Sequence, residues 1–255
     1  MNNPDNHTLS FEIVQKLLDE ISPGSRPIAI RLAPGSYSNF THSVTARDSN
    51  RAEICLVVRR YQPELQLPSY PLLLALQGAN ATAEAEHWMA SVSHGWFLGL
   101  PQSSQVYSPG VYTWNDWDWA LQEVPQRYAT ICAENPIDIG RVVLAGFSIG
   151  GGLAAWLGLS RLIPACGLIL VGPFLANPDH LLPILEKYGP YNLRAYIVAG
   201  TRDRYCYGVA QQLAKMLPNF GIACKLDVYA DLEHSFPLDF ERKLPEALDF
   251  AMSGA

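Results

Sequence analysis

Charged residues are scarce in this chain, and no stretch of it is rich in lysine and arginine. Lysine and arginine number 18 and aspartate and glutamate 24 among 255 residues, which gives a formal net charge of -6. Because a phosphate backbone is bound through clustered basic side chains, this composition argues against a nucleic-acid partner. Hydrophobic residues make up 49% of the chain, which is enough apolar surface for one large domain to build a core.

Cysteine is also sparse, and its spacing excludes two common kinds of site. The five cysteines are widely spaced and form no CxxC pair, which argues against a disulfide framework and against a zinc ribbon. The polar residues 1–6 lack the basic and apolar regions of a secretory signal. We therefore expect a cytoplasmic protein with free thiols and without a metal.

One uncharged stretch is long enough to be compared with a membrane span. Residues 142–159 carry no charge and are near the lower length limit for a spanning helix. Glycines interrupt this stretch and β-branched residues gather at its start, so a buried strand that turns into a buried helix is the better interpretation. No stable membrane insertion is expected.

From residue 71 onward, short apolar runs alternate with segments of helical length. The runs are residues 72–76, 96–100, 142–145, 166–171, 195–199 and 224–229. The predicted helices between and after them are about 81–93, 116–134, 149–160, 179–188, 204–217 and 238–252. Each run is continuous, as expected of a strand covered on both faces. The alternation predicts an α/β fold, with a mostly parallel sheet and helices on both of its faces.

The first part of the chain has a different pattern. Apolar residues at helical spacing predict a helix over 11–21, and residues 42–46 and 52–61 flank a polar turn, as in an antiparallel hairpin. We expect this hairpin at one edge of the sheet. The expected organisation is therefore a single domain, 1–255, made of an N-terminal helical segment (1–25), an edge hairpin (26–70) and a catalytic core (71–255).

A GxSxG motif lies between the predicted strand 142–145 and the helix that follows it, with Ser148 between Gly146 and Gly150. In a nucleophile elbow the serine occupies a strained turn, and the two glycines let strand and helix approach without a Cβ clash. The serine then lies at a helix N-terminus, where free N–H groups favour negative charge. We predict that Ser148 is a nucleophile; the alternative is a glycine-rich turn with an incidental serine.

A serine hydroxyl needs a base that takes its proton as it attacks, and His234 is the predicted base. Where the nucleophile lies on such a turn, the residues follow the chain order serine, acid, histidine. Only His180 and His234 follow Ser148, and His234 lies just after the last predicted strand. Asp203, just after the strand 195–199, is predicted to orient the histidine. The alternative for Asp203 is an N-cap of the helix near Tyr205.

The remaining site predictions concern the oxyanion and the substrate. The backbone N–H of Ile149, next to the nucleophile, and that of Ala79, in the loop after the first parallel strand, are the predicted oxyanion donors. Aromatic side chains supply apolar area with a polar handle. The predicted substrate pocket consists of Gln77, Tyr112, Trp114 and Phe147.

Five segments carry a family resemblance: LLLALQG at 72–78, LPQS at 100–103, GFSIGG at 146–151, AGTRD at 199–203 and LEHSFP at 232–237. Together they resemble the α/β-hydrolase superfamily, specifically its phospholipase/carboxylesterase (predicted esterase) branch. The family often has His-Gly where this chain has Gln77-Gly78, which affects the oxyanion loop. The resemblance covers about residues 70–252 and implies an α/β-hydrolase fold. The interval between Ser148 and Asp203 already holds a strand, a helix and a strand, so no large cap domain is expected.

A second resemblance concerns residues 9–62, where RLAPGSYSNF at 31–40 and LVVRRY at 56–61 are similar to the start of aminoglycoside-phosphotransferase-like kinases. In those kinases a glycine-rich loop covers the nucleotide phosphates. A kinase also needs a catalytic-loop Asp with its Asn and a metal-binding Asp, and the rest of the sequence has no such set. The edge hairpin is the preferred interpretation.

The predicted function is that of a serine hydrolase, a carboxylesterase that cleaves small or medium esters through an acyl-enzyme on Ser148. A thioesterase or peptidase with the same triad, and a non-catalytic hydrolase-fold binding protein, are the alternatives. The expected partner is a small-molecule ester, and no cofactor is expected. The sequence leaves a homodimer open.

Overall fold

The computed structural model describes residues 11–21, 26–32, 41–47, 53–59, 69–79, 85–189 and 191–253. The chain divides into two compact units, Met1–Gln66 and Leu67–Ala255. This grouping differs from the expected single domain, because the strands of the first unit pair only with one another among the described strands.

The first unit contains the helix α1 (Phe11–Ile21) and the strands β1 (Arg26–Leu32), β2 (Thr41–Arg47) and β3 (Glu53–Arg59). The helix and the antiparallel β2–β3 hairpin agree with the sequence prediction. The hairpin is not an edge of the large sheet, however. It forms a separate three-stranded sheet with β1, which the sequence did not predict. Residues 33–40, which belong to the kinase resemblance, lie outside the described residues.

The second unit is built on a six-stranded sheet in the order β11-β10-β9-β8-β4-β5, in which every neighbouring pair is parallel. Its strands are β4 (Tyr70–Leu76), β5 (Phe97–Gly99), β8 (Ile137–Phe147), β9 (Gly167–Val171), β10 (Arg194–Gly200) and β11 (Ala223–Tyr229). All six predicted parallel strands are present. The uncharged stretch 142–159 is the end of β8 followed by a helix, and no helix among the described residues is long and apolar enough to cross a membrane.

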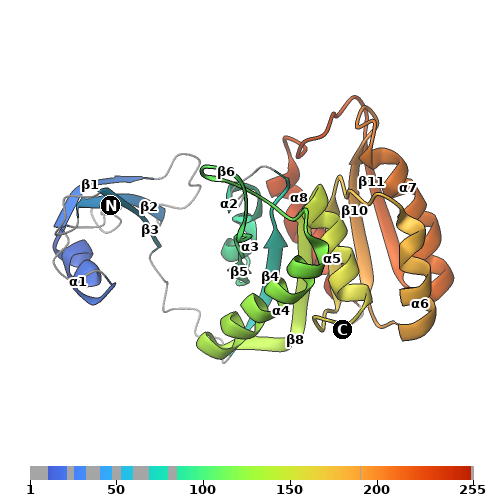
Figure 1. Cartoon of the computed structure of the whole chain (residues 1–255), viewed down its shortest axis with the longest axis horizontal. Coiled ribbons are helices and arrows are strands. Elements are labelled where there is room, and N and C mark those ends of the chain that lie inside the picture. The colour runs from blue at the N-terminus through green and yellow to red at the C-terminus, as the bar shows by residue number, and fades with distance from the viewer. Residues whose placement is uncertain are drawn as a thin grey trace, which may run out of the picture. The chain divides into compact units, whose positions relative to one another are not determined.

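Helices cover both faces of this sheet (Figure 1). They are α2 (Ala85–Trp88), α3 (Ala90–Ser93), α4 (Trp117–Glu134), α5 (Ile149–Leu159), α6 (Leu182–Tyr188), α7 (Cys206–Met216) and α8 (Phe240–Met252). Two 3₁₀ turns, η3 (Pro178–Leu181) and η4 (Leu217–Phe220), adjoin α6 and α7, and a small antiparallel hairpin consists of β6 (Gln105–Ser108) and β7 (Val111–Thr113). Among the described residues between β9 and β10, the helical elements are η3 and α6, which is too little for a large cap domain.

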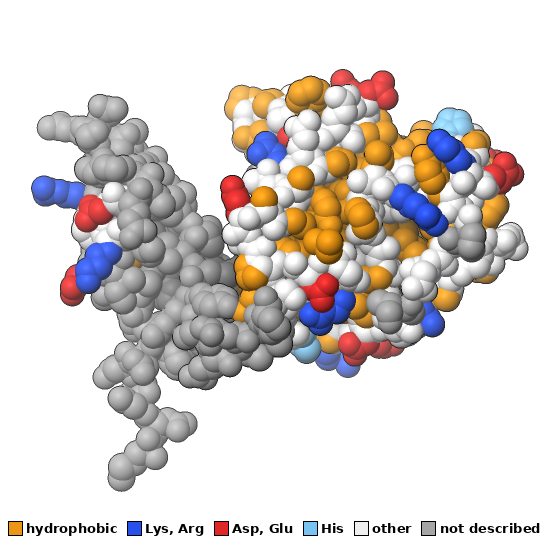
Figure 2. All heavy atoms as spheres, turned by 90° about the horizontal axis from the view of Figure 1, so that it is seen from below, with side chains coloured by type: hydrophobic (Ala, Val, Ile, Leu, Met, Phe, Trp, Pro, Cys, Tyr) orange, Lys and Arg blue, Asp and Glu red, His pale blue; other side chains and the backbone are white. Residues whose placement is uncertain are grey.

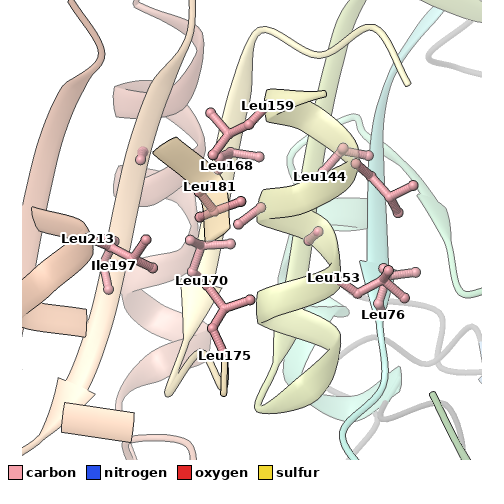
Figure 3. Close-up of a cluster of buried hydrophobic side chains, with 14 of the residues drawn as sticks. Leu76, Leu144, Leu153, Leu159, Leu168, Leu170, Leu175, Leu181, Ile197 and Leu213 are labelled. Carbon is pink, nitrogen blue, oxygen red and sulfur yellow. The ribbon is translucent and has the colours of Figure 1, made fainter. Parts of the chain in front are cut away.

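The strand β4 shows how the core is divided between the two faces. All seven of its residues are buried, and successive side chains of a strand point to opposite faces. Leu72, Leu74 and Leu76 belong to the cluster that packs under α4, α5 and α7, whereas Leu73 and Ala75 belong to the cluster under α8. Figure 3 shows the first cluster, in which leucines of the strands and of α5 interdigitate.

The strand order also determines where a site can form. The chain leaves β4 toward β5 on one side and returns to β8 on the other side of β4. In open parallel sheets, ligands bind outside the carboxyl ends of the strands at such a reversal of strand order. The residues that follow β4 and β8, Gln77 and Ser148, are therefore expected to border the site.

The surface of the second unit carries scattered charges of both signs. On the face shown in Figure 2, Lys and Arg side chains are interspersed with Asp and Glu, and hydrophobic side chains occupy broad areas between them. Large apolar side chains with substantial exposure include Val106, Tyr107, Trp119, Phe174 and Tyr205. This face therefore has no basic patch of the kind that binds a phosphate backbone.

Candidate active site

Ser148 is the one residue between β8 and α5, and its backbone is strained. Its φ of 55° and ψ of -125° lie in a region that costs a non-glycine residue about 1–3 kcal/mol. Its N–H donates to the carbonyl oxygen of Val171 at 2.9 Å, and its own carbonyl accepts from the N–H of Phe174 at 2.9 Å. The end of β9 and the residues after it thus hold the serine in this conformation.

The glycines on either side of Ser148 are required by close backbone contacts. A Cβ atom at Gly146 would lie 2.4 Å from the backbone oxygen of Gly150, and a Cβ at Gly150 would lie 2.3 Å from the backbone oxygen of Gln77. No side chain fits at either position without a backbone shift. The GxSxG spacing therefore follows from the packing of α5 against the ends of β8 and β4.

The structure brings the three residues of the predicted triad together. The hydroxyl of Ser148 lies 2.8 Å from Nε2 of His234, and Nδ1 of His234 lies 2.6 Å from Oδ2 of Asp203. In the arrangement that suits a general base, Ser148 donates to Nε2 and the Nδ1–H donates to the carboxylate. The His234 side chain is 40% exposed while Asp203 is 3% exposed, so the imidazole is accessible and the carboxylate is buried.

The two carboxylate oxygens of Asp203 have different hydrogen-bond partners. Its Oδ2 accepts from His234, and its Oδ1 accepts from the backbone N–H of Cys206 at the start of α7, at 3.0 Å. A buried carboxylate is costly unless hydrogen bonds replace its water. The helix amide supplies one such bond, and the second oxygen bonds the imidazole.

The loop after β4 lies against the start of α5. Gln77 and Gly78 are buried and Ala79 is exposed. The indole N–H of Trp114 donates to the backbone oxygen of Gln77 at 3.1 Å, and the side-chain amide of Gln102 donates to the Gln77 side-chain oxygen. The N–H of a first helical residue, which Ile149 is, has no acceptor within its own helix. The two predicted oxyanion donors thus belong to two adjoining segments.

Similarity to known proteins is found among solved structures and not among sequences. No protein-family model and no curated protein sequence matches the chain. An uncharacterized protein from Bacillus cereus ATCC 10987 is 24% identical with a TM-score of 0.67, covers 81% of this chain, and is itself covered over 65% of its length. Esterase PE8 is 16% identical with a TM-score of 0.60, over 70% of this chain and 93% of its own. The S-formylglutathione hydrolase FrmB from Staphylococcus aureus is 12% identical with a TM-score of 0.58, over 88% of this chain and 96% of its own.

These similarities agree with the mostly parallel sheet and its covering helices. The chain has the α/β-hydrolase fold. The comparisons give no support to the kinase resemblance of residues 9–62.

The four residues predicted to form a substrate pocket differ in burial and in the groups that they contact. Trp114 is fully buried and Gln77 is 2% exposed, and both belong to the support of the loop after β4. Tyr112 is half-buried and lies on β7. Phe147 is half-buried, and its ring stacks on the imidazole of His234. Trp114 and Gln77 therefore have structural partners that the sequence did not indicate.

Two side chains that support the site were not among the predicted site residues, although Gln102 lies in the LPQS segment at 100–103. Gln102 follows β5 and holds Gln77, as described above. Glu123, on α4, is 6% exposed, and its carboxylate accepts from the backbone N–H of Ser104 at 3.0 and 3.3 Å. An acid inside a predicted helix is usually solvated, and only the tertiary structure shows that this one anchors the segment that carries Gln102.

Cys206 is a second candidate nucleophile by position, but not by chemistry. Its sulfur, an Asp203 oxygen and a His234 nitrogen lie within 4.8 Å of one another, the one such grouping of metal-ligand side chains among the described residues. Burial, with the charge of Asp203 and a hydrogen bond to it, raises the pKa of the Cys206 thiol to about 12. A thiol in this state is protonated at neutral pH and is a poor nucleophile and metal ligand. We interpret the grouping as a hydrogen-bond network centred on Asp203.

Proposed function

We propose that this chain is a serine hydrolase that cleaves carboxylic esters, with Ser148 as nucleophile, His234 as general base and Asp203 as the orienting acid. The observation that carries the proposal is the continuous hydrogen-bond chain from the Ser148 hydroxyl through the imidazole to a buried carboxylate. The strained backbone of Ser148, at a helix N-terminus, adds to it because strain clusters at functional positions.

In the proposed first half-reaction, the Ser148 oxygen attacks the ester carbonyl carbon while Nε2 of His234 takes the hydroxyl proton. The C–O bond forms as the carbonyl π electrons move to oxygen, and the N–H groups of Ile149 and Ala79 are the proposed donors to that oxyanion. A well-placed donor of this kind contributes about 3–4 kcal/mol. When the tetrahedral intermediate collapses, the bond to the alcohol breaks and His234 returns its proton to the leaving oxygen.

The second half-reaction repeats these steps with water. His234 takes a proton from a water molecule as that molecule attacks the acyl carbon, and Ser148 leaves with the proton from Nε2. The acid is released and the starting protonation state is restored. Throughout both halves, Asp203 stays ionised and keeps the Nδ1–H directed at its carboxylate, which stabilises the transient imidazolium.

The surroundings of the triad favour small apolar esters. The described residues after β9 form no cap domain, and three segments next to the triad carry exposed apolar side chains. These are Phe174, whose N–H bonds to Ser148, Tyr205, two residues after Asp203, and Leu238, four residues after His234. An open apolar surface binds a short acyl group without enclosing a long one. Esterase PE8 and the other esterases among the similar structures agree with an ester substrate.

The test is hydrolysis of p-nitrophenyl esters of increasing acyl length by the full chain. We expect turnover of the acetate and butyrate esters and kcat/KM lower by about tenfold or more for the palmitate, since unburied methylenes contribute no binding energy. Thioester and peptide substrates are run beside them, because a thioesterase or peptidase would have the same triad. Preference for a long-chain ester, a thioester or a peptide would contradict the proposed substrate class.

We keep the cytoplasm as the proposed location. The described cysteines, Cys132, Cys166, Cys206 and Cys224, are free thiols, which suits a reducing compartment.

A further inference from the structure

The side chain of Phe147 contacts the imidazole of His234. It is the last residue of β8 and directly precedes Ser148. Its ring and the imidazole of His234 are nearly parallel, with centroids 4.8 Å apart and an interplanar angle of 28°. The predicted role of this residue was a wall of the substrate pocket, whereas in the structure its ring stacks on the histidine.

The geometry of His234 leaves only the faces of the imidazole for such a contact. Both ring nitrogens bond in the ring plane, Nε2 to Ser148 and Nδ1 to Asp203. These two bonds fix the positions of the two ring nitrogens. They still allow the imidazole plane to tilt about the line through Nδ1 and Nε2. A flat side chain against one face restricts that tilt.

Phe147 is itself held in place on its other sides. Its ring centroid lies 4.7 Å from that of Phe236, which in turn stacks on His87 at 3.9 Å with an interplanar angle of 17°. A Cβ at Gly78 would lie 2.9 Å from Cδ1 of Phe147, so the ring also packs tightly against the loop that follows β4. The same side chain therefore touches the proposed base and the proposed oxyanion loop.

We propose that Phe147 is a positioning residue that acts through His234, where its ring face fixes the plane of the imidazole and stabilises the imidazolium formed in each half-reaction. The face of an aromatic ring carries negative potential and attracts a cation within about 6 Å of its centroid. In the proposed mechanism the imidazole becomes cationic only while it holds the serine or water proton. The attraction is thus stronger in the transition state than in the ground state, and it raises kcat rather than tightening substrate binding.

This inference rests on the proposed serine hydrolase function, and its test separates the two. Ester hydrolysis by wild type, Phe147→Leu, Phe147→Met and Phe147→Tyr is measured across pH. Leucine and methionine keep the site apolar without an aromatic face, and tyrosine keeps the ring. Two apolar variants are used so that a failure of one of them to fold does not end the test.

For the leucine and methionine variants we expect kcat to fall about three- to tenfold, with KM within about twofold of wild type. Without the ring face the imidazolium is less stable relative to neutral imidazole, so the acidic limb of kcat/KM moves to lower pH by about half a unit. Among the described residues, the other titratable side chains grouped with His234 are Asp203 and Cys206, and these substitutions leave both in place. The tyrosine variant is expected to retain the wild-type limb.

Phe236→Leu is the matched control, because it removes a ring that packs against Phe147 in a tilted arrangement, while the ring that stacks on His234 is that of Phe147. We expect it to leave the acidic limb where it is. A rise in KM with an unmoved limb in the Phe147 variants would assign Phe147 to substrate binding and overturn the inference, as would wild-type behaviour of the apolar variants. If wild type itself hydrolyses none of the esters, the proposed function fails and this inference fails with it.

Discussion

Ser148→Ala is expected to lower kcat for p-nitrophenyl acetate by a factor of about 10⁶, because it removes the atom that forms the acyl-enzyme and leaves only binding and the oxyanion donors. The measurement is steady-state hydrolysis with enough protein to follow a residual rate. Ser160→Ala, at the opposite end of α5, is the matched control and should keep kcat within about twofold of wild type. Comparable loss in both variants would indicate damage to the helix rather than removal of a nucleophile.

The same assay tests the role of Asp203. Asp203→Asn keeps the size of the side chain and an oxygen that can accept from the N–H of Cys206, but it removes the charge that orients the imidazole. We expect kcat to fall by about 10⁴. A loss below about tenfold would mean that Asp203 serves as a helix cap and that another group orients His234.

Gly150→Ala is expected to destabilise the protein by about 3 kcal/mol or more, because the new Cβ would lie 2.3 Å from the backbone oxygen of Gln77 and 2.4 Å from that of Leu76. Helix propensity alone predicts the opposite sign, a gain of about 1 kcal/mol for alanine over glycine. The sign of the change in the free energy of unfolding, measured by urea titration, therefore decides which effect dominates.

Gly208→Ala provides the control for this substitution. Gly208 lies in α7, and a Cβ there would meet no atom within 4 Å. Propensity then acts without a clash, and we expect stabilisation by about 0.5–1 kcal/mol. Equal effects of the two substitutions would contradict the close approach of α5 to the end of β4.

The strands of the large sheet were predictable because they are covered on both faces, which leaves continuous apolar runs such as 72–76. β1 and the β6–β7 hairpin were not predictable in this way. Pro27 lies within β1, where proline disfavours a strand interior. β6 and β7 are short and partly exposed, although Gly110, with a φ of 75° in the turn between them, was a usable signal.

The arrangement of the triad could be anticipated for a topological reason. Ser148, Asp203 and His234 each follow a strand of one parallel sheet, and the carboxyl ends of parallel strands share an edge. The contacts of Phe147 and Cys206 could not be anticipated. They depend on how the loop that carries His234 packs against the end of β8 and the start of α7, and no spacing in the sequence encodes that packing.

The central claim is that Ser148 is activated by His234 and Asp203, and the most direct measurement is intact mass after incubation with a fluorophosphonate. Such probes react with a serine whose hydroxyl is deprotonated by a neighbouring base during attack. The account predicts a single adduct on the wild-type chain that is absent from Ser148→Ala. A folded wild-type protein that forms no adduct, or an adduct that persists in Ser148→Ala, would contradict it and favour a binding role for the fold.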